Sequence, residues 1–249
     1  MGSSFRWNAF ERHTLFVLAC TLTSCGAAPQ VQPTPDYRAD ALRTKAVLFV
    51  PLAVSNDLGD ERTGIVLSDS ARLGASSAAC RHLAETWSDG RLVCFDEKRI
   101  AGSPEFSELV LLFALDKPIP ADLWQRVRRA SGAEYALLFR PESVSSSQEV
   151  SQETRGMMMP VGGLATSVFV SAMLFSATAR TRTANTTELS YTVSASLVEM
   201  PTGKLLKVGV HSASDSRTVN RNLGFAEPPP AAPILEEVMT DLGEEVLDD

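Results

Sequence analysis

Few side chains in this chain combine the residue types and spacing that catalysis requires. Only His82 and His211 follow the N-terminal region, and the serine-rich stretch Ser143 to Ser151 has no histidine placed to act as its base. The carboxylates near Asp57 are typical of a solvated loop. Gly162-Gly163 lacks the Lys-Ser or Lys-Thr of a phosphate-binding loop. We therefore expect no enzymatic activity and no cofactor.

The thiol of Cys25 has a more informative context. Basic residues precede an apolar, uncharged run from Thr14 to Thr23, which suits a signal peptide and is too short to span a membrane. The run ends in Leu22-Thr23-Ser24-Cys25, which resembles the bacterial lipobox: an aliphatic residue, two small residues and a cysteine that receives lipid. The sequence predicts a signal peptide over residues 1–24 and a lipid anchor at Cys25. The alternative is a secretory signal whose cysteines are incidental.

The residues after Cys25 indicate where the anchored protein would lie. Gly26 stands where an Asp commonly signals inner-membrane retention, so the resemblance implies the outer membrane and a domain that faces the periplasm. Prolines recur between residues 25 and 44, and such a segment favours an extended polyproline conformation. We expect residues 25–44 to be a tether and residues 45–249 to be a periplasmic domain.

Export would also determine the state of the remaining cysteines. Cys20 would leave with the signal peptide, so that Cys80 and Cys94 form the one remaining pair. A pair of thiols in an oxidising compartment is a candidate disulfide, and two buried free thiols are the alternative. Although His82 and Glu85 would share one helix face, no second pair of ligands accompanies them, so we expect no metal site.

The first half of the expected domain alternates strands and helices. Lys45 to Val54 is a continuous apolar run that is typical of a strand buried on both faces. Helical spacing of apolar residues follows from Ile65 to Trp87, and Arg91 to Asp96 forms a second short strand. Two further helices, each opened by a proline, and a strand from Glu134 to Val144 complete this half.

The second half predicts a hairpin and a helix. Apolar and polar residues alternate from Thr186 to Met200, as in an antiparallel strand with one solvated face. Pro201-Thr202-Gly203 is a turn signal, and Lys204 to His211 returns as the partner strand. Ile234 to Leu247 is an acidic amphipathic helix. The expected fold is α/β, with a mixed sheet, helices on its faces and a C-terminal antiparallel β-hairpin followed by a helix.

Charge and family resemblance indicate the kind of partner. The net charge of -7 argues against a nucleic-acid partner, because phosphate binding needs a clustered basic surface. "AVLFVPLAV", "RASGAEYALLFRPESV" and "SYTVSASLVEMPTGKLLKVG" together resemble the CsgG/LpoB/TolB N-terminal domain group. That resemblance implies a non-enzymatic envelope protein that forms homo-oligomers or binds other envelope proteins. The alternative that it implies is a subunit of an oligomeric outer-membrane secretion pore of the CsgG type.

A long uncharged run at residues 156–179 separates the third strand from the hairpin. A membrane-spanning helix, a membrane-inserting hairpin, and an apolar insertion that packs on the sheet or on a partner are the alternatives. Gly, Ser and Thr dilute its hydrophobicity, which favours the third. As candidate partner or membrane contacts we take its large apolar residues: Met157, Met158, Met159, Val168, Phe169, Val170, Met173, Leu174 and Phe175.

Overall fold

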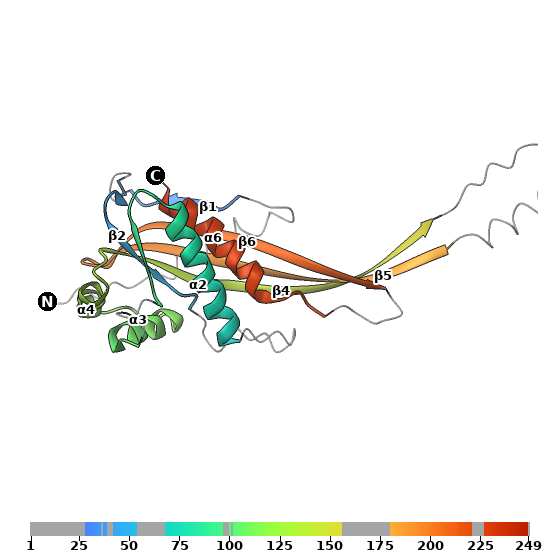
Figure 1. Ribbon diagram of the computed structural model, residues 1–249, viewed down its shortest axis with the longest axis horizontal. Helices are drawn as coiled ribbons and strands as arrows, with labels where there is room; N and C mark the ends of the chain where they lie inside the picture. The colour runs from blue at the N-terminus through green and yellow to red at the C-terminus, as the bar shows by residue number, and fades with distance from the viewer. Residues whose placement is uncertain are drawn as a thin grey trace, which may run out of the picture. The chain divides into compact units, whose positions relative to one another are not determined.

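Six strands form one mixed sheet in the order β1-β6-β5-β4-β2-β3, as seen in the computed structural model (Figure 1). The structure describes residues 28–35, 37–38, 42–53, 68–96, 100, 102–155, 180–220 and 227–248. The strands are β1 (Gln30–Pro33), β2 (Ala46–Val50), β3 (Arg91–Cys94), β4 (Tyr135–Arg155), β5 (Arg180–Glu199) and β6 (Lys204–Asn220). The α/β prediction, with its hairpin β5-β6 and the helix that follows, is confirmed.

Four described helices accompany the sheet. They are α2 (Asp69–Thr86), α3 (Pro104–Ala114), α4 (Ala121–Ser131) and α6 (Ala231–Leu247). α2 and α3 begin at a serine cap, and α4 and α6 begin after a proline. Ser68 and Ser103 accept a backbone N–H at the start of α2 and α3, which satisfies a donor that the helix itself leaves unpaired. None of the helices in the described part of the chain is both long and apolar enough to cross a membrane.

The chain divides into two compact units. Unit 1 comprises residues 1–145, 190–214 and 230–249, and unit 2 comprises residues 146–189 and 215–229. The helices and the short strands belong to unit 1, whereas β4, β5 and β6 each contribute residues to both units.

The core of unit 1 lies on both faces of the sheet around β2. The parallel pairing of β2 with β3 and β4 makes it a central strand, and Val47 to Val50 are all fully buried. The rings of Phe49 and Phe139 meet at 4.9 Å on one face. A strand buried on both faces reads as a continuous apolar run, which is why the sequence identified it.

Helices α2 and α6 lie against each other on one face of the sheet (Figure 1). Glycines permit the close approach, because a Cβ on Gly243 of α6 would lie 2.5 Å from a methyl carbon of Leu83 in α2. A Cβ on Gly209 of β6 would likewise lie 2.7 Å from Leu242 of α6 and 2.9 Å from Val31 of β1. These glycines therefore set how closely α6 packs on α2 and on the sheet.

The start of the fold differs from the sequence prediction. The sequence analysis placed Gln30 to Pro33 in the tether of residues 25–44, but they form the edge strand β1, antiparallel to β6. Leu42 is also buried. Pro33 is tolerated because an edge strand can leave one N–H position unpaired, and Val31 packs where Gly209 leaves room. The prolines correctly predicted an extended backbone, but they did not indicate that this segment pairs with β6.

The longest strands extend further than their apolar patterns. β4 continues to Arg155 and β6 to Asn220, beyond the expected ends at Val144 and His211. Both extensions are rich in Ser and other polar residues, so they lack the period-two hydrophobic signal that marks a half-buried strand. Pairing with neighbouring strands defines them instead.

Tyr191 in β5 provides a test of the core. Its side chain is 1 % exposed, and its hydroxyl has no hydrogen-bond partner among the described residues. Burial raises the pKa of this phenol from its ordinary value of 10.0. The unfolded chain would ionise first as pH rises, so Tyr191 makes the folded state lose stability above about pH 10.

We predict that Tyr191→Phe leaves the free energy of unfolding at pH 7 unchanged or raises it by about 1 kcal/mol, because no hydrogen bond is lost. The variant should also lose less stability than the parent between pH 9 and 11 in urea titrations. Tyr135, whose pKa is also raised by burial, accounts for part of the slope that remains. A loss of about 1 kcal/mol or more at pH 7 would show that the hydroxyl has a partner.

Candidate functional site

The strands β4 and β6 are longer than the strands that flank them. β6 has 17 residues, and β1 pairs with Lys207 to Val210 alone. β4 has 21 residues, and β2 pairs with Tyr135 to Leu138. Beyond these pairings, the outer edges of β4 and β6 have no partner strand within the described parts of the chain. We define the candidate site as these two edges, termed the β4 edge (Arg140 to Ser151) and the β6 edge (His211 to Thr218).

The pairing with β1 shows which backbone groups of β6 face outward. The N–H of Thr34 donates to the carbonyl of Leu206 at 2.7 Å, and Gln32 lies opposite Val208 in the same register. In an antiparallel pair, such hydrogen-bonded positions recur at every second residue. The even-numbered residues of β6 therefore direct N–H and C=O groups toward β1, and farther along toward the unpaired edge.

The register of β6 against β5 is unbroken along this edge. Hydroxyl groups of Thr192 and Ser212 lie 2.9 Å apart, and those of Thr186 and Thr218 lie 2.9 Å apart six residues farther on. Two cross-strand pairs at the same offset leave no residue for a bulge between them. The pairing with β1 therefore also indicates that the backbone N–H and C=O groups of Ser214, Ser216 and Thr218 face outward.

Asp215 covers one of the outward-facing N–H groups of the β6 edge. Its carboxylate accepts the N–H of the next residue, Ser216, at 2.7 Å. Ser216 is even-numbered, so this N–H is one that would otherwise bond to a neighbouring strand. An acidic side chain that covers an edge donor is one way to leave a strand edge unpaired without leaving the donor unsatisfied.

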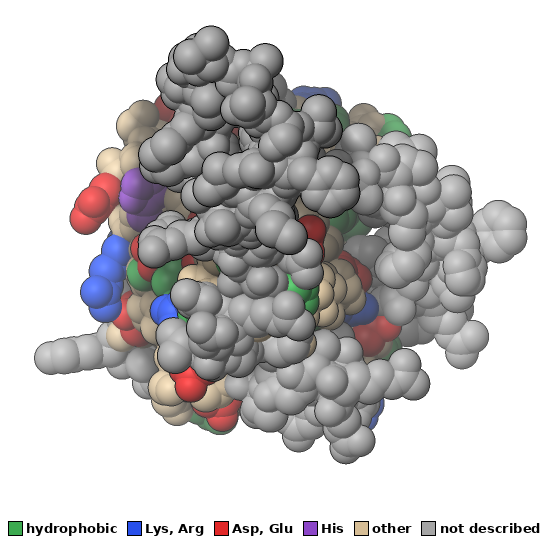
Figure 2. Space-filling view, turned by 90° about the vertical axis from the view of Figure 1, so that its right-hand side faces the viewer, with side chains coloured by type: hydrophobic (Ala, Val, Ile, Leu, Met, Phe, Trp, Pro, Cys, Tyr) green, Lys and Arg blue, Asp and Glu red, His purple; other side chains and the backbone are tan. Residues whose placement is uncertain are grey.

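Polar side chains cover these strand segments. Ser145 and Ser147 to Val150 are exposed in β4, as are Ser214 to Thr218 in β6. On β5, Ser194 donates to Glu142 at 2.6 Å and Glu188 accepts from Ser147 at 3.4 Å. Figure 2 shows acidic and basic side chains interspersed among the described residues on one side of the molecule. Neither strand extension presents an apolar face that would fix it in the core.

At the β4 edge, proline ends the regular pairing. Ala53 donates its N–H to the carbonyl of Phe139 at 3.0 Å, and Pro141 follows without an N–H to continue the ladder. Arg140 lies 2.9 Å from Asp116, just beyond α3, so this side chain is committed to the helices of unit 1. Between Arg140 and Ser151, Glu142 and Glu149 are the charged residues that follow.

A buried lysine in β6 contacts both an N-terminal and a C-terminal segment of the described chain. Lys207 is 4 % exposed, lies 4.4 Å from the centre of the Tyr37 ring, and donates to the backbone carbonyl of Asp248. With β1, these contacts fix where the N-terminal segment leaves the sheet. Since Cys25 precedes Gln30 by only a short stretch, the chain between them can span at most about 18 Å.

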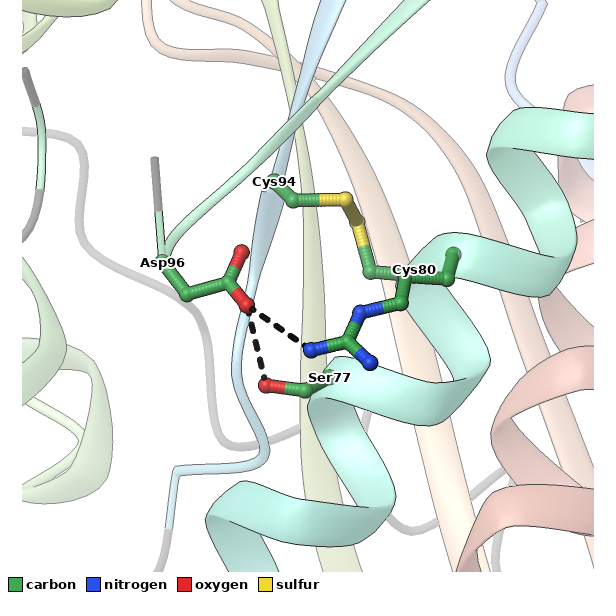
Figure 3. Close-up of a disulfide and its surroundings, with 5 residues drawn as sticks. Ser77, Cys80, Cys94 and Asp96 are labelled. Atoms are coloured by element: carbon green, nitrogen blue, oxygen red, sulfur yellow. Dashed lines mark hydrogen bonds and ion pairs between the residues drawn. A yellow bond between two sulfur atoms is a disulfide. The ribbon is translucent and has the colours of Figure 1, made fainter. Parts of the chain in front are cut away.

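Cys80 and Cys94 are joined by a disulfide, with their Cα atoms 5.9 Å apart (Figure 3). Cys80 lies on the buried side of α2, and Cys94 ends the edge strand β3. Asp96 accepts from Ser77 at 3.4 Å and lies 3.6 Å from Arg81, so polar contacts flank the bridge (Figure 3). The bridge fastens β3 to the helix that covers it.

The other residues singled out from the sequence are not brought together. His82 lies 3.6 Å from Glu244, and His211 lies 3.4 Å from Asp241, each next to α6. The described residues include no group of His, Cys, Asp and Glu that could hold a metal ion. Cys25 and the nine candidate contacts between Met157 and Phe175 lie outside the described residues. The β6 edge was not predicted from the sequence, because its one signal is a serine-rich segment that contains both an acidic and a basic residue.

No known protein family matches this chain, and no curated protein matches it in sequence. Solved structures similar to it include the PelC dodecamer from Paraburkholderia phytofirmans, at 14% identity and TM-score 0.37, which covers 89% of this chain and 99% of that one. The hypothetical protein CT253 from Chlamydia trachomatis has 10% identity and TM-score 0.41, with coverages of 82% and 96%. Lipoprotein GNA1162 from Neisseria meningitidis has 12% identity and TM-score 0.31, with coverages of 81% and 97%. At these TM-scores, the likenesses assign no function to this chain.

We predict that the replacement Cys80→Ala with Cys94→Ala lowers the free energy of unfolding by about 3 kcal/mol, the chain-entropy value for a loop of about 15 residues. Urea unfolding followed by circular dichroism measures the change. A reducing agent should destabilise the parent protein by a similar amount and leave the double variant unchanged. Equal sensitivity of both proteins to the reducing agent would contradict the bridge.

Proposed function

We propose that this chain is a non-enzymatic lipoprotein of the bacterial cell envelope that binds or assembles with envelope proteins. In this proposal, lipid on Cys25 anchors it to the outer membrane, and residues 45–249 with the edge strand β1 face the periplasm. The β4 edge and the β6 edge are the binding surfaces. The observation that carries the binding function is the long β6 edge, whose Ser216 N–H is covered by a side chain of its own strand.

Two features support a location outside the cytosol. The N-terminal order of basic residues, apolar run, small residues and Cys25 is that of a lipoprotein signal. Independently, Cys80 and Cys94 are bonded, and disulfides persist in oxidising compartments such as the periplasm. The short reach from Cys25 to Gln30 would then keep the domain beside the membrane, where envelope partners lie.

Strand-edge chemistry supports binding to proteins. An unpaired edge offers a row of N–H and C=O groups that an incoming strand can pair with, a mode known as β-augmentation. The β6 edge is exposed from Ser214 to Thr218, so an incoming strand meets no described helix there. Affinity would come from the backbone and selectivity from the alternating side chains.

The absence of catalysis is also part of the proposal. It is supported by the lack of a complete nucleophile, base and orienting group in the sequence. His82 and His211 each lie beside a carboxylate of α6 rather than beside a serine or cysteine nucleophile. Binding through strand edges requires none of these groups.

The anchor can be tested in cells. We predict that Cys25→Ala abolishes labelling by a radioactive or clickable fatty acid and moves the protein from the membrane fraction to the soluble fraction after lysis. Cys20→Ala is the matched control and should leave both readouts unchanged. Membrane retention of the Cys25→Ala protein with undiminished lipid labelling would refute the anchor.

The binding surfaces can be tested by site-specific photo-crosslinking in whole cells. We predict defined covalent adducts when a photoreactive amino acid replaces Ser214 at the β6 edge or Ser145 in β4, because both side chains are exposed beside an unpaired strand edge. Ser190 on the central strand β5 is the matched control and should yield none. Mass spectrometry of the adducts identifies the partner. Equal adducts from all three positions, or none from any, would contradict binding through the edges.

A further inference from the structure

We propose that the β6 edge pairs with the β6 edge of a second copy of this chain. The two strands would run antiparallel about a two-fold axis that passes between the two Ser216 residues. This proposal rests on the proposed function, since it names the partner that one of the two binding edges takes.

The backbone of β6 is compatible with such a pairing. Because even-numbered residues face the edge in both copies, Ser216 would lie opposite the second copy's Ser216, and Ser214 opposite its Thr218. Each such pair exchanges two N–H···O bonds, as Thr34 and Leu206 do in part on the same edge of β6. The pairing continues a ladder that β1 begins at Lys207 to Val210.

The charges on β6 select one register. With Ser216 on the axis, Asp215 lies opposite the second copy's Arg217, and symmetry repeats this pair on the other side. The two smallest shifts that keep even-numbered residues opposite each other would place Asp215 opposite Asp215, or Arg217 opposite Arg217. Opposite charges directly across from each other stabilise an antiparallel pair, and like charges destabilise it. Both side chains are exposed in β6, so both are available for this contact.

Asp215 has a role in each state. In the single copy its carboxylate accepts the N–H of Ser216 at 2.7 Å. In the pair, that N–H would donate to the second copy's Ser216 carbonyl, and the carboxylate would turn to the second copy's Arg217. The N–H of Ser216 then has a partner in both states. The pairing is therefore reversible without leaving a buried polar group unpaired.

The β4 edge fits a second copy less well. Between Arg140 and Ser151 the charged side chains after Arg140 are Glu142 and Glu149, so an antiparallel β4–β4 pair would lack positive partners along this stretch. A β4–β6 pair between two copies would join two different edges, so it would not close about a two-fold axis and would leave one edge of each kind open. Among these pairings, the β6–β6 pair alone is self-complementary in charge.

A cysteine on the axis reports the register. In the proposed pair the two Ser216 Cα atoms would be about 5.5 Å apart, which is within the range that a disulfide bridges. We predict that the full chain with Ser216→Cys, in detergent or in native membranes, forms a covalent dimer under mild oxidation. Thr218→Cys is the matched control, since its two copies would lie about 13 Å apart along the strands. The parent protein controls for the native cysteines.

Charge exchange tests the same register without a crosslink. Asp215→Arg or Arg217→Asp alone would place like charges opposite each other at two positions of the pair. We predict that the dissociation constant of the dimer, measured by analytical ultracentrifugation of the full chain, rises by at least about ten-fold. The double exchange, Asp215→Arg with Arg217→Asp, should restore the dimer to within about three-fold of the parent. Thermal unfolding of each variant confirms that these exposed substitutions leave the fold intact.

The outcomes separate this inference from the proposed function. Dimers that follow these patterns support both. A Ser214 photo-adduct with another protein, accompanied by a monomeric parent chain, overturns the β6–β6 pair and leaves edge binding standing. A dimer that forms through Thr218→Cys, or one that neither single exchange weakens, overturns the register. A monomeric chain with no edge adducts overturns both.

Discussion

A backbone donor or acceptor at a strand edge must find a partner or remain in water. β6 presents more of these groups than the described strand β1 pairs with. β1 provides partners for Lys207 to Val210, and the strand then continues to Asn220. Other features of the chain can be understood from this mismatch. Polar residues keep the extension soluble, Asp215 covers the N–H of Ser216, and no described helix packs on Ser214 to Thr218. In the proposed function, another strand pairs with this edge reversibly.

The rest of unit 1 provides a rigid base for β6. Gly209 lets α6 approach the strand closely, Gly243 lets α6 approach α2, and the disulfide of α2 fastens β3 at the far edge of the sheet. Lys207 adds the contact with Tyr37 and with the C-terminal end of α6. The base is therefore tied together by packing, a covalent bridge and a buried cation.

The predictability of each element from sequence follows from its burial. β2, with both faces covered, and β5, with its alternating face, have strong apolar patterns, and both were located correctly. α2 was located by the helical spacing of its apolar residues, and α3 by the proline at its start. By contrast, β1 and the ends of β4 and β6 are held by backbone pairing rather than by apolar side chains. A pattern of residue types does not encode that pairing, so β1 was predicted as part of a tether and the strands β4 and β6 were predicted to end too early.

The candidate site divides in the same way. Cys80 and Cys94 could be predicted as a candidate disulfide, because they are the two cysteines that would remain after export and processing. The β6 edge could not be predicted from the sequence. It is recognised from two structural features, which are the hydrogen bond between Asp215 and the N–H of Ser216 and the position of β1 along β6. Both depend on which strands are neighbours. The pairing that places β1 beside β6 joins residues more than a hundred positions apart, such as Gln30 and Val210.

Amide hydrogen exchange of the full chain in detergent, followed residue by residue as protein concentration rises, tests the central claim most directly. If β6 edges pair, the amides of Ser214, Ser216 and Thr218 become protected with concentration. Those of Asp215 and Arg217, which face β5, change little. Rapid exchange of the even-numbered amides at every concentration, with protection elsewhere in β6 unchanged, would contradict the account.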